Sequence, residues 1–333
     1  MTTATVQDTV TSTGSRDEST LAGAALRAMA ANPGLRAAFL RSSALRDLFS
    51  VPAGRYVVAH DRDGLRDRLA LLSAKGYRTG VEYVGEEVTD PAEVEAIVQE
   101  YLALIAEAAP GTAEPVQLGF DLSNVGSLIS PDLARENTSR ILRAAQAKNI
   151  TVVISMERSG FVDDILKVFH ELAPEHPNVG LTLQAHLHRT PEDLDAVAGH
   201  GRKVRLVKGV YRESPHVALP RGAELNERYA DLAARLLDRG VPLACGTHDA
   251  ATLSLLDERG LIGRLAEIEM LHGVQPALLR ACRTRGVPCR VATVYGENWW
   301  LHFLHRLAEH PPNVLTALAD MADPGRVRFG EEY

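Results

Sequence analysis

The sequence predicts an α/β protein whose main fold is a (β/α)8 barrel of the TIM type, preceded by an N-terminal helical segment. Eight short β-like runs follow one another between residues 78 and 295, and each is followed by a helix-like stretch. Strands that alternate with helices form parallel sheets, and eight such units close into a barrel. A doubly wound sheet is the competing interpretation, but it normally uses fewer strands, and no GxGxxG motif follows the first run.

The elements can be placed in order along the chain. Residues 1–20 are rich in Thr and Ser and hold no hydrophobic block, so we expect a disordered leader there. Stretches rich in Ala and Leu predict a helical segment over residues 21–75, and we expect the barrel to occupy residues 76–325. The predicted strands are 78–85, 114–123, 150–156, 179–187, 203–211, 242–249, 268–274 and 289–295.

Composition excludes several classes of function. A hydrophobic content of 45% and a charged content of 24% are those of an ordinary globular protein. The net charge of −7 argues against a nucleic-acid partner. No apolar run approaches the roughly 20 residues that span a bilayer, so we expect no integral membrane segment and a cytoplasmic location. The cysteines Cys245, Cys282 and Cys289 lack metal-type spacing, and we expect no metal site.

Polar residues gather at the ends of the predicted strands. In a (β/α)8 barrel the chemistry lies at the C-terminal ends of the strands, so this rule converts the strand list into a list of candidates. Any one of them alone could be structural, but their convergence on one rim predicts an active site there. The candidates are Gln117, Asp121, Ser155, Glu157, Gln184, His186, Arg205, Lys208, Thr247, His248 and His272.

The segment NWWLHFLHRLAEH, residues 298–310, predicts a helix with two different faces. One face carries an apolar stripe with the spacing of a buried helix surface. The other carries a polar stripe of two histidines, one arginine and one glutamate, which is unusual for a simple solvated face. The apolar stripe is Trp300, Phe303, Leu304 and Leu307, and the polar stripe is His302, His305, Arg306 and Glu309.

Several motifs resemble those of the proline dehydrogenase family, whose members are FAD enzymes built on a distorted (β/α)8 barrel. The most specific is RLVKGVY at 205–211, which resembles the fifth barrel strand of that family. The resemblance covers roughly residues 55–315, and its strength lies in the order and spacing of seven matches. The others are VEYVGEE at 81–87, QLGFDLS at 117–123, Leu183-Gln184 with Arg189-Thr190, THD at 247–249, LHGV at 271–274, and YGE at 295–297 with RLAE at 306–309.

The resemblance implies FAD as the cofactor and assigns residues to it. Arg205 matches the arginine near the flavin N5, where a fixed cation favours the electron-rich reduced ring. Gln184 matches a residue that hydrogen-bonds the isoalloxazine ring. The remaining cofactor-binding residues match positions around the phosphates, the ribityl chain and the adenosine, or adjoin them: Met156, Lys208, Gly209, Val210, Thr247 and His248.

The resemblance also gives the polar stripe a function. In the family the last helix covers the mouth of the barrel and faces the substrate above the flavin. Arg306 matches one of two adjacent arginines that bind the substrate carboxylate, and Glu309 matches the acid that pairs with them. Tyr295 and Ala292 complete the expected substrate-binding residues, together with His305.

The positions that would face the substrate depart from the family pattern. His305 stands where the family has the first arginine of the pair, and Glu114 stands where it has a catalytic-site lysine. Ser155 replaces the aspartate that pairs with that lysine, and Ala292 replaces a tyrosine that packs on the proline ring. Two unit charges about 4 Å apart interact by ~4 kcal/mol at an effective dielectric near 20, so these changes would penalise a proline carboxylate. We expect Arg205, Ser155 and Glu114 to be the catalytic residues.

Three functions remain open on the sequence alone. The first is an FAD-dependent oxidoreductase that oxidises a small amine or amino-acid-like substrate at a C–N or N–N bond by hydride transfer to flavin N5. The second is an authentic L-proline dehydrogenase that forms pyrroline-5-carboxylate, with His305 protonated and Glu114 turned away. The third is a catalytically silent flavin-binding protein. The electron acceptor is open among a quinone, oxygen and a protein.

Overall fold

The computed structural model describes residues 13–85, 87–108 and 116–333, and it divides the chain into two compact units. In the described residues, one unit combines residues 13–54 with residues 298–327 and is helical. The other combines residues 55–297 with residues 328–333 and contains every strand of the described chain. The two ends of the chain therefore contribute to one helical unit, and the middle forms the barrel unit.

The barrel is a closed ring of parallel strands in sequence order, from β1 to β8 and back to β1. The closing pair sets Gly80 of β1 opposite Ala292 of β8, and on its other side Gly80 lies opposite Gln117 of β2. The strands are β1 Arg78–Tyr83, β2 Gln117–Phe120, β3 Val152–Ile154, β4 Val179–Gln184, β5 Lys203–Val207, β6 Leu243–Gly246, β7 Glu267–Leu271 and β8 Cys289–Tyr295.

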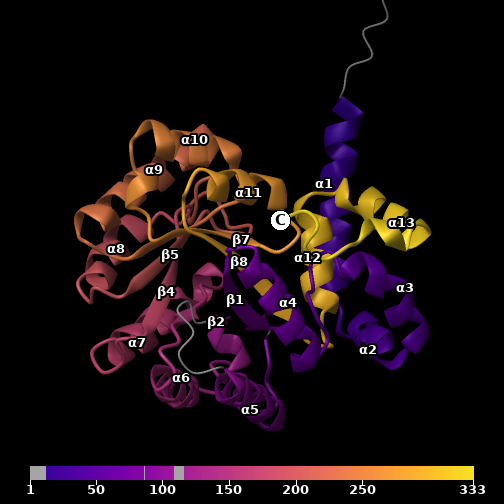
Figure 1. Ribbon diagram of the computed structural model, residues 1–333, viewed down its shortest axis with the longest axis horizontal. Helices are drawn as coiled ribbons and strands as arrows, with labels where there is room; N and C mark the ends of the chain where they lie inside the picture. The colour runs from indigo at the N-terminus through magenta and orange to yellow at the C-terminus, as the bar shows by residue number, and fades with distance from the viewer. Residues whose placement is uncertain (1–12, 86, 109–115) are drawn as a thin grey trace, which may run out of the picture. The chain divides into compact units, whose positions relative to one another are not determined.

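Helices cover the outside of the ring, as Figure 1 shows for α5 to α11. Several begin at side chains that accept a backbone N–H of the first turn, namely Asp90, Ser130 and Asp249. The helices of this unit are α4 Arg62–Ala74, α5 Pro91–Glu107, α6 Pro131–Gln146, α7 Val162–Leu172, α8 Thr190–Ala198, α9 Ala223–Asp238, α10 Ala250–Glu258 and α11 Pro276–Thr284, with short 3-10 turns η1 Leu122–Asn124, η2 Ser159–Phe161 and η3 Ile262–Arg264.

The core of the barrel unit lies between the strands and their helices. Every residue of β2, β3, β4 and β8 is buried, as expected for parallel strands covered on both faces. Outward side chains such as Leu181 and Leu206 join those of the helices, for example Leu236, in one apolar cluster. The opposite face of the strands points into the barrel, and there the side chains are largely polar.

The helical unit is built from both ends of the chain, coloured indigo and yellow in Figure 1. Phe39 packs its ring on Trp299 and Trp300, with ring centroids 4.8 Å apart in both pairs. Phe49 packs on Phe303 with centroids 6.2 Å apart. Its helices are α1 Thr13–Ala30, α2 Pro33–Arg41, α3 Ser43–Ala53, α12 Trp300–Glu309 and α13 Asn313–Ala322, with a 3-10 turn η4 Pro324–Arg326.

The eight predicted strands are confirmed, although most end earlier than their β-like runs because the last residues turn into the rim loops. The predicted segment boundaries need correction. Helix α4, which we expected in the N-terminal segment, belongs to the barrel unit, whereas α12 and α13 join the N-terminal helices. Helix α1 begins at Thr13, so residues 13–20 of the expected leader are helical, and residues 1–12 lie outside the described chain. In the described residues, no helix is long and apolar enough to cross a bilayer.

Candidate active site

Arg205 lies at the centre of a polar cluster inside the barrel. Its guanidinium donates from Nε to Thr182 Oγ1 on β4 (2.9 Å) and from Nη2 to Ser155 Oγ just after β3 (2.8 Å). Nη1 donates to two carboxylates, Glu82 Oε1 on β1 (3.1 Å) and Glu269 Oε1 on β7 (2.9 Å). Side chains from four other parts of the ring therefore fix the orientation of one cation.

The cluster depends on local features of its strands. Gly119 of β2 lies beside Glu82, and a Cβ on this glycine would stand 2.6 Å from Glu82 Oε1. Glycine therefore leaves the space that the carboxylate occupies. Burial opposes the charge on Arg205, but the attraction of Glu269 and Glu82 outweighs it and holds the pKa of the guanidinium above its ordinary value. Arg205 remains a cation under all ordinary conditions.

A second polar layer continues the cluster inside the barrel. Gln117 Nε2 donates to Glu269 Oε2 (3.1 Å), and Lys203 Nζ donates to Gln117 Oε1. Lys203 also pairs with Glu267, which accepts from Arg290 Nε (2.8 Å) and Nη2 (3.0 Å). Burial would raise the pKa of the Glu267 carboxyl, but Lys203 and Arg290 lower it to about 2. The interior charges are thus joined in one hydrogen-bonded network.

Gln184, at the end of β4, presents an unused hydrogen-bond acceptor. Thr190 Oγ1 donates to the backbone oxygen of Gln184 (2.6 Å), and Gln184 Nε2 donates to the backbone oxygen of Glu157 (2.7 Å). The side-chain Oε1 of Gln184 is buried and has no donor among the described residues. Because buried polar atoms are normally hydrogen-bonded, this oxygen is suited to accept from a ligand N–H.

Glu157 is the carboxylate of the β3 rim. Its side chain is buried, and its Oε1 accepts from the backbone N–H of Ser123 (3.1 Å). Burial raises the pKa of the Glu157 carboxyl, although hydrogen bonds from Ser123 oppose the shift. The neighbouring Arg158 pairs with Glu87 from the loop after β1, so the β1 and β3 rim loops are joined.

The backbone after β5 makes a close approach that requires glycine. Gly209 has φ 104°, and a Cβ there would stand 1.6 Å from His186 Nδ1. Burial lowers the pKa of the His186 imidazole, and its buried Nε2 has no partner in the described chain. Lys208, the preceding residue, pairs with Asp249 and donates to Asn226 Oδ1. This segment combines the cation of Lys208 with backbone that packs closely against the His186 ring.

Thr247 and His248, at the end of β6, are held by backbone groups. Thr247 Oγ1 accepts from the N–H of Asp249 (3.2 Å). His248 Nε2 accepts from the N–H of Leu271 on β7 (2.8 Å), so the imidazole proton is on Nδ1. His248 is therefore neutral and fixed in one tautomer.

Three further predicted site residues near the strand ends differ in their exposure and in their contacts. Met156 is buried directly after Ser155, whereas Val210 is exposed on the loop after β5. The ring of His272 stacks on Tyr333 with centroids 5.7 Å apart, and its Nδ1 shares a 3.0 Å hydrogen bond with the Tyr333 hydroxyl. His272 is thus used for packing the C-terminal residues.

The expected substrate residues Ala292 and Tyr295 lie on opposite faces of β8. Ala292 shares its face with Arg290, whose guanidinium lies inside the barrel, so Ala292 also faces the interior. Tyr295 is fully buried, and its hydroxyl donates to Glu100 Oε1 on α5 (2.7 Å). The Tyr295 side chain therefore faces the helix layer, and its part in substrate binding stays a prediction.

Helix α12 confirms the predicted separation of apolar and polar faces. Trp300, Phe303, Leu304 and Leu307 are all buried within this part of the chain. On the polar face Arg306 Nη2 pairs with Glu309 Oε1 (2.7 Å), while the buried Arg306 Nε has no acceptor among the described residues. Burial, together with the nearby Arg306 and Arg27, lowers the pKa of His305 to about 4.

Two negative residues named from the sequence cannot be placed. Glu114, the expected replacement of a lysine, lies outside the described residues, and so does Glu86 of the first-strand match. Whether Glu114 faces the site therefore stays a prediction.

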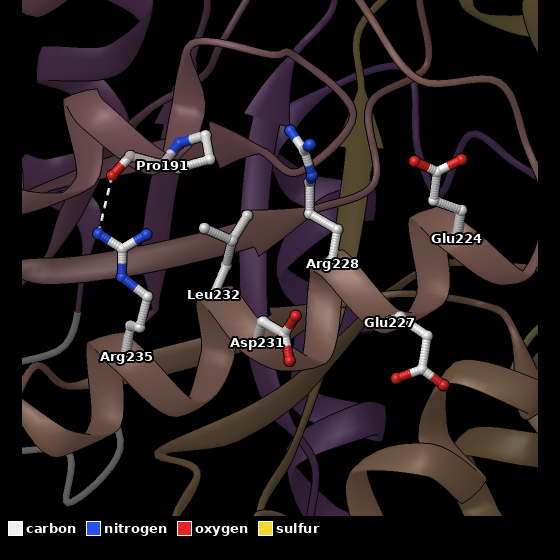
Figure 2. Close-up of a pocket in the computed structure, with 7 residues that line it drawn as sticks. All are labelled: Pro191, Glu224, Glu227, Arg228, Asp231, Leu232 and Arg235. Atoms are coloured by element: carbon white, nitrogen blue, oxygen red, sulfur yellow. Dashed lines mark hydrogen bonds between the residues drawn. The ribbon is translucent and has the colours of Figure 1, made fainter.

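A groove of about 420 Å³ lies elsewhere, on the helix layer. Figure 2 shows its lining residues, all of which come from α8 and α9: Pro191, Glu224, Glu227, Arg228, Asp231, Leu232 and Arg235. Glu227 and Asp231 pair with Arg259, and Arg235 donates to the backbone oxygen of Pro191 (2.8 Å). None of the lining residues belongs to a strand or a strand end, and we assign this groove no part in catalysis.

Sequence reasoning missed the carboxylates of β7. Glu267 and Glu269 each hold interior cations, yet neither was among the candidates. Their spacing was the available signal, because residues two apart in a strand share a face. Two carboxylates on one face of a strand in a fully covered barrel require cationic partners.

Arg205, Lys208 and the buried acceptor Gln184 Oε1 thus lie on or directly after β4 and β5 of a closed parallel barrel. This is the arrangement of a (β/α)8 enzyme, whose active site lies at the C-terminal ends of the strands. The family model described as proline dehydrogenase matches residues 65–309 of the chain. The chain belongs to the proline dehydrogenase family.

Similar proteins are also named as proline dehydrogenases. The chain is 30% identical to "Proline dehydrogenase 2" of Bacillus subtilis (strain 168) over 275 residues, which cover 81% of this chain and 90% of the relative. It is 28% identical to "Proline dehydrogenase" of Deinococcus radiodurans over 278 residues, which cover 81% and 89%. The chain is accordingly a flavin-dependent oxidoreductase that acts on a CH–NH donor, in a family that uses FAD.

Solved structures show the same fold. Proline utilization A (PutA) from Bdellovibrio bacteriovorus, inactivated by N-propargylglycine, superposes with a TM-score of 0.73 at 18% identity over 93% of this chain. This chain spans only 39% of the length of that protein. PutA from Bradyrhizobium japonicum gives a TM-score of 0.65 at 20% identity over 84% of this chain.

Proposed function

We propose that this protein is an FAD-dependent dehydrogenase that oxidises a small amine or amino-acid-like substrate other than simple proline. The observation that carries the proposal is the state of the two residues expected to bind a carboxylate. His305 has a pKa of about 4 and is neutral near neutral pH, and Arg306 already shares its charge with Glu309. A neutral imidazole thus stands where the family pattern has the first of two adjacent arginines, while Arg306 keeps the acidic partner that the pattern also has.

The described cations that lie inside the barrel or follow β5 directly are each already paired with a carboxylate. Arg205 is shared by Glu82 and Glu269, Lys203 and Arg290 are held by Glu267, and Lys208 is paired with Asp249. A carboxylate entering this interior would have to compete with a buried carboxylate for each of these cations. A substrate that is neutral or cationic at this end avoids that competition.

The residues present fit FAD. Gln184 Oε1 is a buried acceptor in need of an N–H, which the flavin pyrimidine ring offers. We propose that Gln184, Arg205 and Met156 contact the ring system. We propose that Lys208, Gly209, Val210, Thr247 and His248 contact the rest of the cofactor.

FAD, when bound, would supply the acceptor for the hydride, which carries both electrons away from the substrate. The substrate loses a hydride from the carbon or nitrogen beside its amine and a proton from the amine, which gives an imine or another oxidised nitrogen species. Arg205 holds a positive charge beside the acceptor, and Ser155 helps to orient it. Glu114 is proposed to bind the ammonium group or to take the proton, and Arg306 with His305 to bind a polar group of the substrate.

Authentic L-proline dehydrogenase activity is the second candidate, and the 30% identity to a protein named proline dehydrogenase favours it. It requires His305 to regain a proton against the burial that lowers its pKa. A flavin-binding protein without turnover is the third possibility. The electron acceptor stays open among a quinone, oxygen and a protein, and the cytoplasmic location stays a prediction.

Anaerobic reduction of the flavin separates the three candidates. Purified yellow protein is mixed with proline and with a panel of cyclic and acyclic amines, hydrazines and amino acids, and bleaching of the flavin absorbance is followed. We expect one of the other compounds to reduce the flavin faster than proline does. Rapid bleaching by submillimolar proline would establish the second candidate, and a yellow protein that nothing reduces would establish the third.

A further inference from the structure

We propose that Glu269 is a positioning residue that aims the Arg205 guanidinium and sets the reduction potential of the flavin through it. The inference rests on the proposed flavin site, and it concerns a residue of this chain that the family motifs named above did not single out. Its basis is geometric: Glu269 is the buried carboxylate that joins the two polar layers of the barrel interior.

The hydrogen bonds of Arg205 use four of its five guanidinium N–H groups. A guanidinium carries five N–H groups. One on Nε goes to Thr182, the two on Nη1 go to Glu82 and Glu269, and one on Nη2 goes to Ser155. Within the described part of the chain, the second N–H of Nη2 finds no acceptor. Because Nη1 is fully used by the two carboxylates, Nη2 is the nitrogen left to meet a ligand.

Glu269 contributes more to this arrangement than Glu82 does. The Glu269 side chain is 3% exposed, whereas that of Glu82 is 29% exposed. Water therefore screens the charge of Glu82 more strongly than that of Glu269. Glu269 is also fixed at its second oxygen by Gln117, whose own oxygen is held by Lys203. The carboxylate cannot swing away without breaking a chain of buried hydrogen bonds.

The electrostatic consequence has a definite sign. A cation beside the flavin favours the reduced, electron-rich ring. Two carboxylates on one guanidinium give the cluster a net charge of one negative unit, so the stabilisation of the reduced ring is smaller than a lone arginine would give. Removing the Glu269 charge should therefore make the flavin easier to reduce, while the arginine itself stays in place.

Two variants test this. Glu269→Gln removes the charge and keeps an oxygen for Arg205 Nη1, but it sets its amide N–H against the amide N–H of Gln117. The double variant Gln117→Glu with Glu269→Gln exchanges carboxylate and amide, so that every hydrogen bond regains a donor and an acceptor and the net charge of the protein is unchanged. The exchange moves the carboxylate from Arg205 to Lys203, and it keeps the test valid if the single variant folds poorly.

The midpoint potential of the bound flavin is measured by slow anaerobic reduction against reference dyes, without any substrate. We expect both variants to raise the ratio of reduced to oxidised flavin at a fixed potential by about tenfold, or about 30 mV for a two-electron couple. Glu82→Gln should raise it less. Glu95→Gln, which removes a carboxylate from the exposed pair with Arg140, should leave it unchanged.

The outcomes are separable from those of the proposed function. Variants that are yellow and share the wild-type potential would overturn the inference and leave the proposed function standing. A rise of the same size in Glu95→Gln would overturn it as well, because the effect would then not act through Arg205. Wild-type protein that cannot be reconstituted with FAD would overturn both proposals.

Discussion

Arg205 and Arg306 illustrate two ways in which this protein holds a cation. Arg205, in the barrel unit, donates to two carboxylates, a serine and a threonine. Arg306, in the helical unit, has one carboxylate partner, and its buried Nε has no acceptor among the described residues. Four of the five N–H groups of Arg205 are used by neighbouring side chains, whereas Arg306 has one carboxylate partner and a buried Nε without an acceptor in the described residues. The two arginines therefore differ in how much of their hydrogen-bonding capacity the surrounding residues already use.

The largest effect on stability and activity is expected from replacing Arg205. Arg205→Met leaves the buried Glu269 and the partly exposed Glu82 without their cation, and breaking a buried pair costs about 3–5 kcal/mol of folding free energy. We expect this variant to lose that much stability in urea unfolding and to show no amine-driven bleaching of the flavin. Arg205→Lys keeps the charge and serves as the control. A stable Arg205→Met protein that still turns over would show that the cluster has no catalytic part.

The ion pairs that Glu267 forms inside the barrel predict that the protein loses stability in acid. The pKa of Glu267 is about 2 in the folded protein against an ordinary 4.5, so its stabilisation is present above about pH 4.5 and is lost as the pH falls towards 2. A shift of this size corresponds to about 3 kcal/mol. Glu267→Gln should lower the free energy of unfolding by that order at neutral pH, and by progressively less on acidification. A difference from wild type that does not shrink at low pH would contradict the ion-pair account.

Restoring an arginine at position 305, beside Arg306, should strengthen the response to proline. His305→Arg places a permanent charge beside Arg306, and a hydrogen bond to a charged group contributes about 1.5–3 kcal/mol. We expect proline-driven bleaching to reach half its maximal rate at a concentration about tenfold lower or more. His305→Gln, which stays neutral, is the matched control and should change little. Equal responses of the two variants would show that position 305 does not contact a carboxylate.

The smallest effect is expected at exposed pairs. Glu95 and Arg140 form a bidentate pair on the surface, and the pKa of Glu95 is lowered to about 2 by hydrogen bonds from Arg140 and Gln99. The Glu95 side chain is 48% exposed, so water screens the pair, and exposed pairs contribute about 0.2–1 kcal/mol. Glu95→Gln should therefore lower the free energy of unfolding by less than about 1 kcal/mol. A loss as large as that of Glu267→Gln would contradict the contrast between interior and surface charges.

The elements that could be predicted from the sequence are those in which apolar residues recur at a regular spacing. Eight β-like runs gave eight strands, and the i, i+3, i+4, i+7 stripe of Trp300, Phe303, Leu304 and Leu307 gave the buried face of α12. Arg205 was found because its motif is specific. The opposite orientations of Ala292 and Tyr295 could also be predicted, since residues an odd number of positions apart in a strand face opposite sides.

Other features depend on pairing across the barrel, which a single sequence does not reveal. Glu269 meets Arg205 and Gln117 only because β7, β5 and β2 face one interior. The neutral state of His305 follows from burial and from Arg27, which is far away in sequence. Glu114 lies outside the described residues, so its expected position in the site stays a prediction.

Proline and pyrrolidine share one ring and differ in the carboxylate, and comparing them tests the central claim most directly. The rate of anaerobic flavin bleaching is measured for both at several concentrations with the wild-type protein near neutral pH. If the protein does not bind the substrate carboxylate strongly, the apparent second-order rate constant for proline should exceed that for pyrrolidine by less than about tenfold. This ratio is the equivalent of ~1.4 kcal/mol. A hundredfold or greater advantage of proline would contradict the account and identify the protein as a proline dehydrogenase in activity as well as in family.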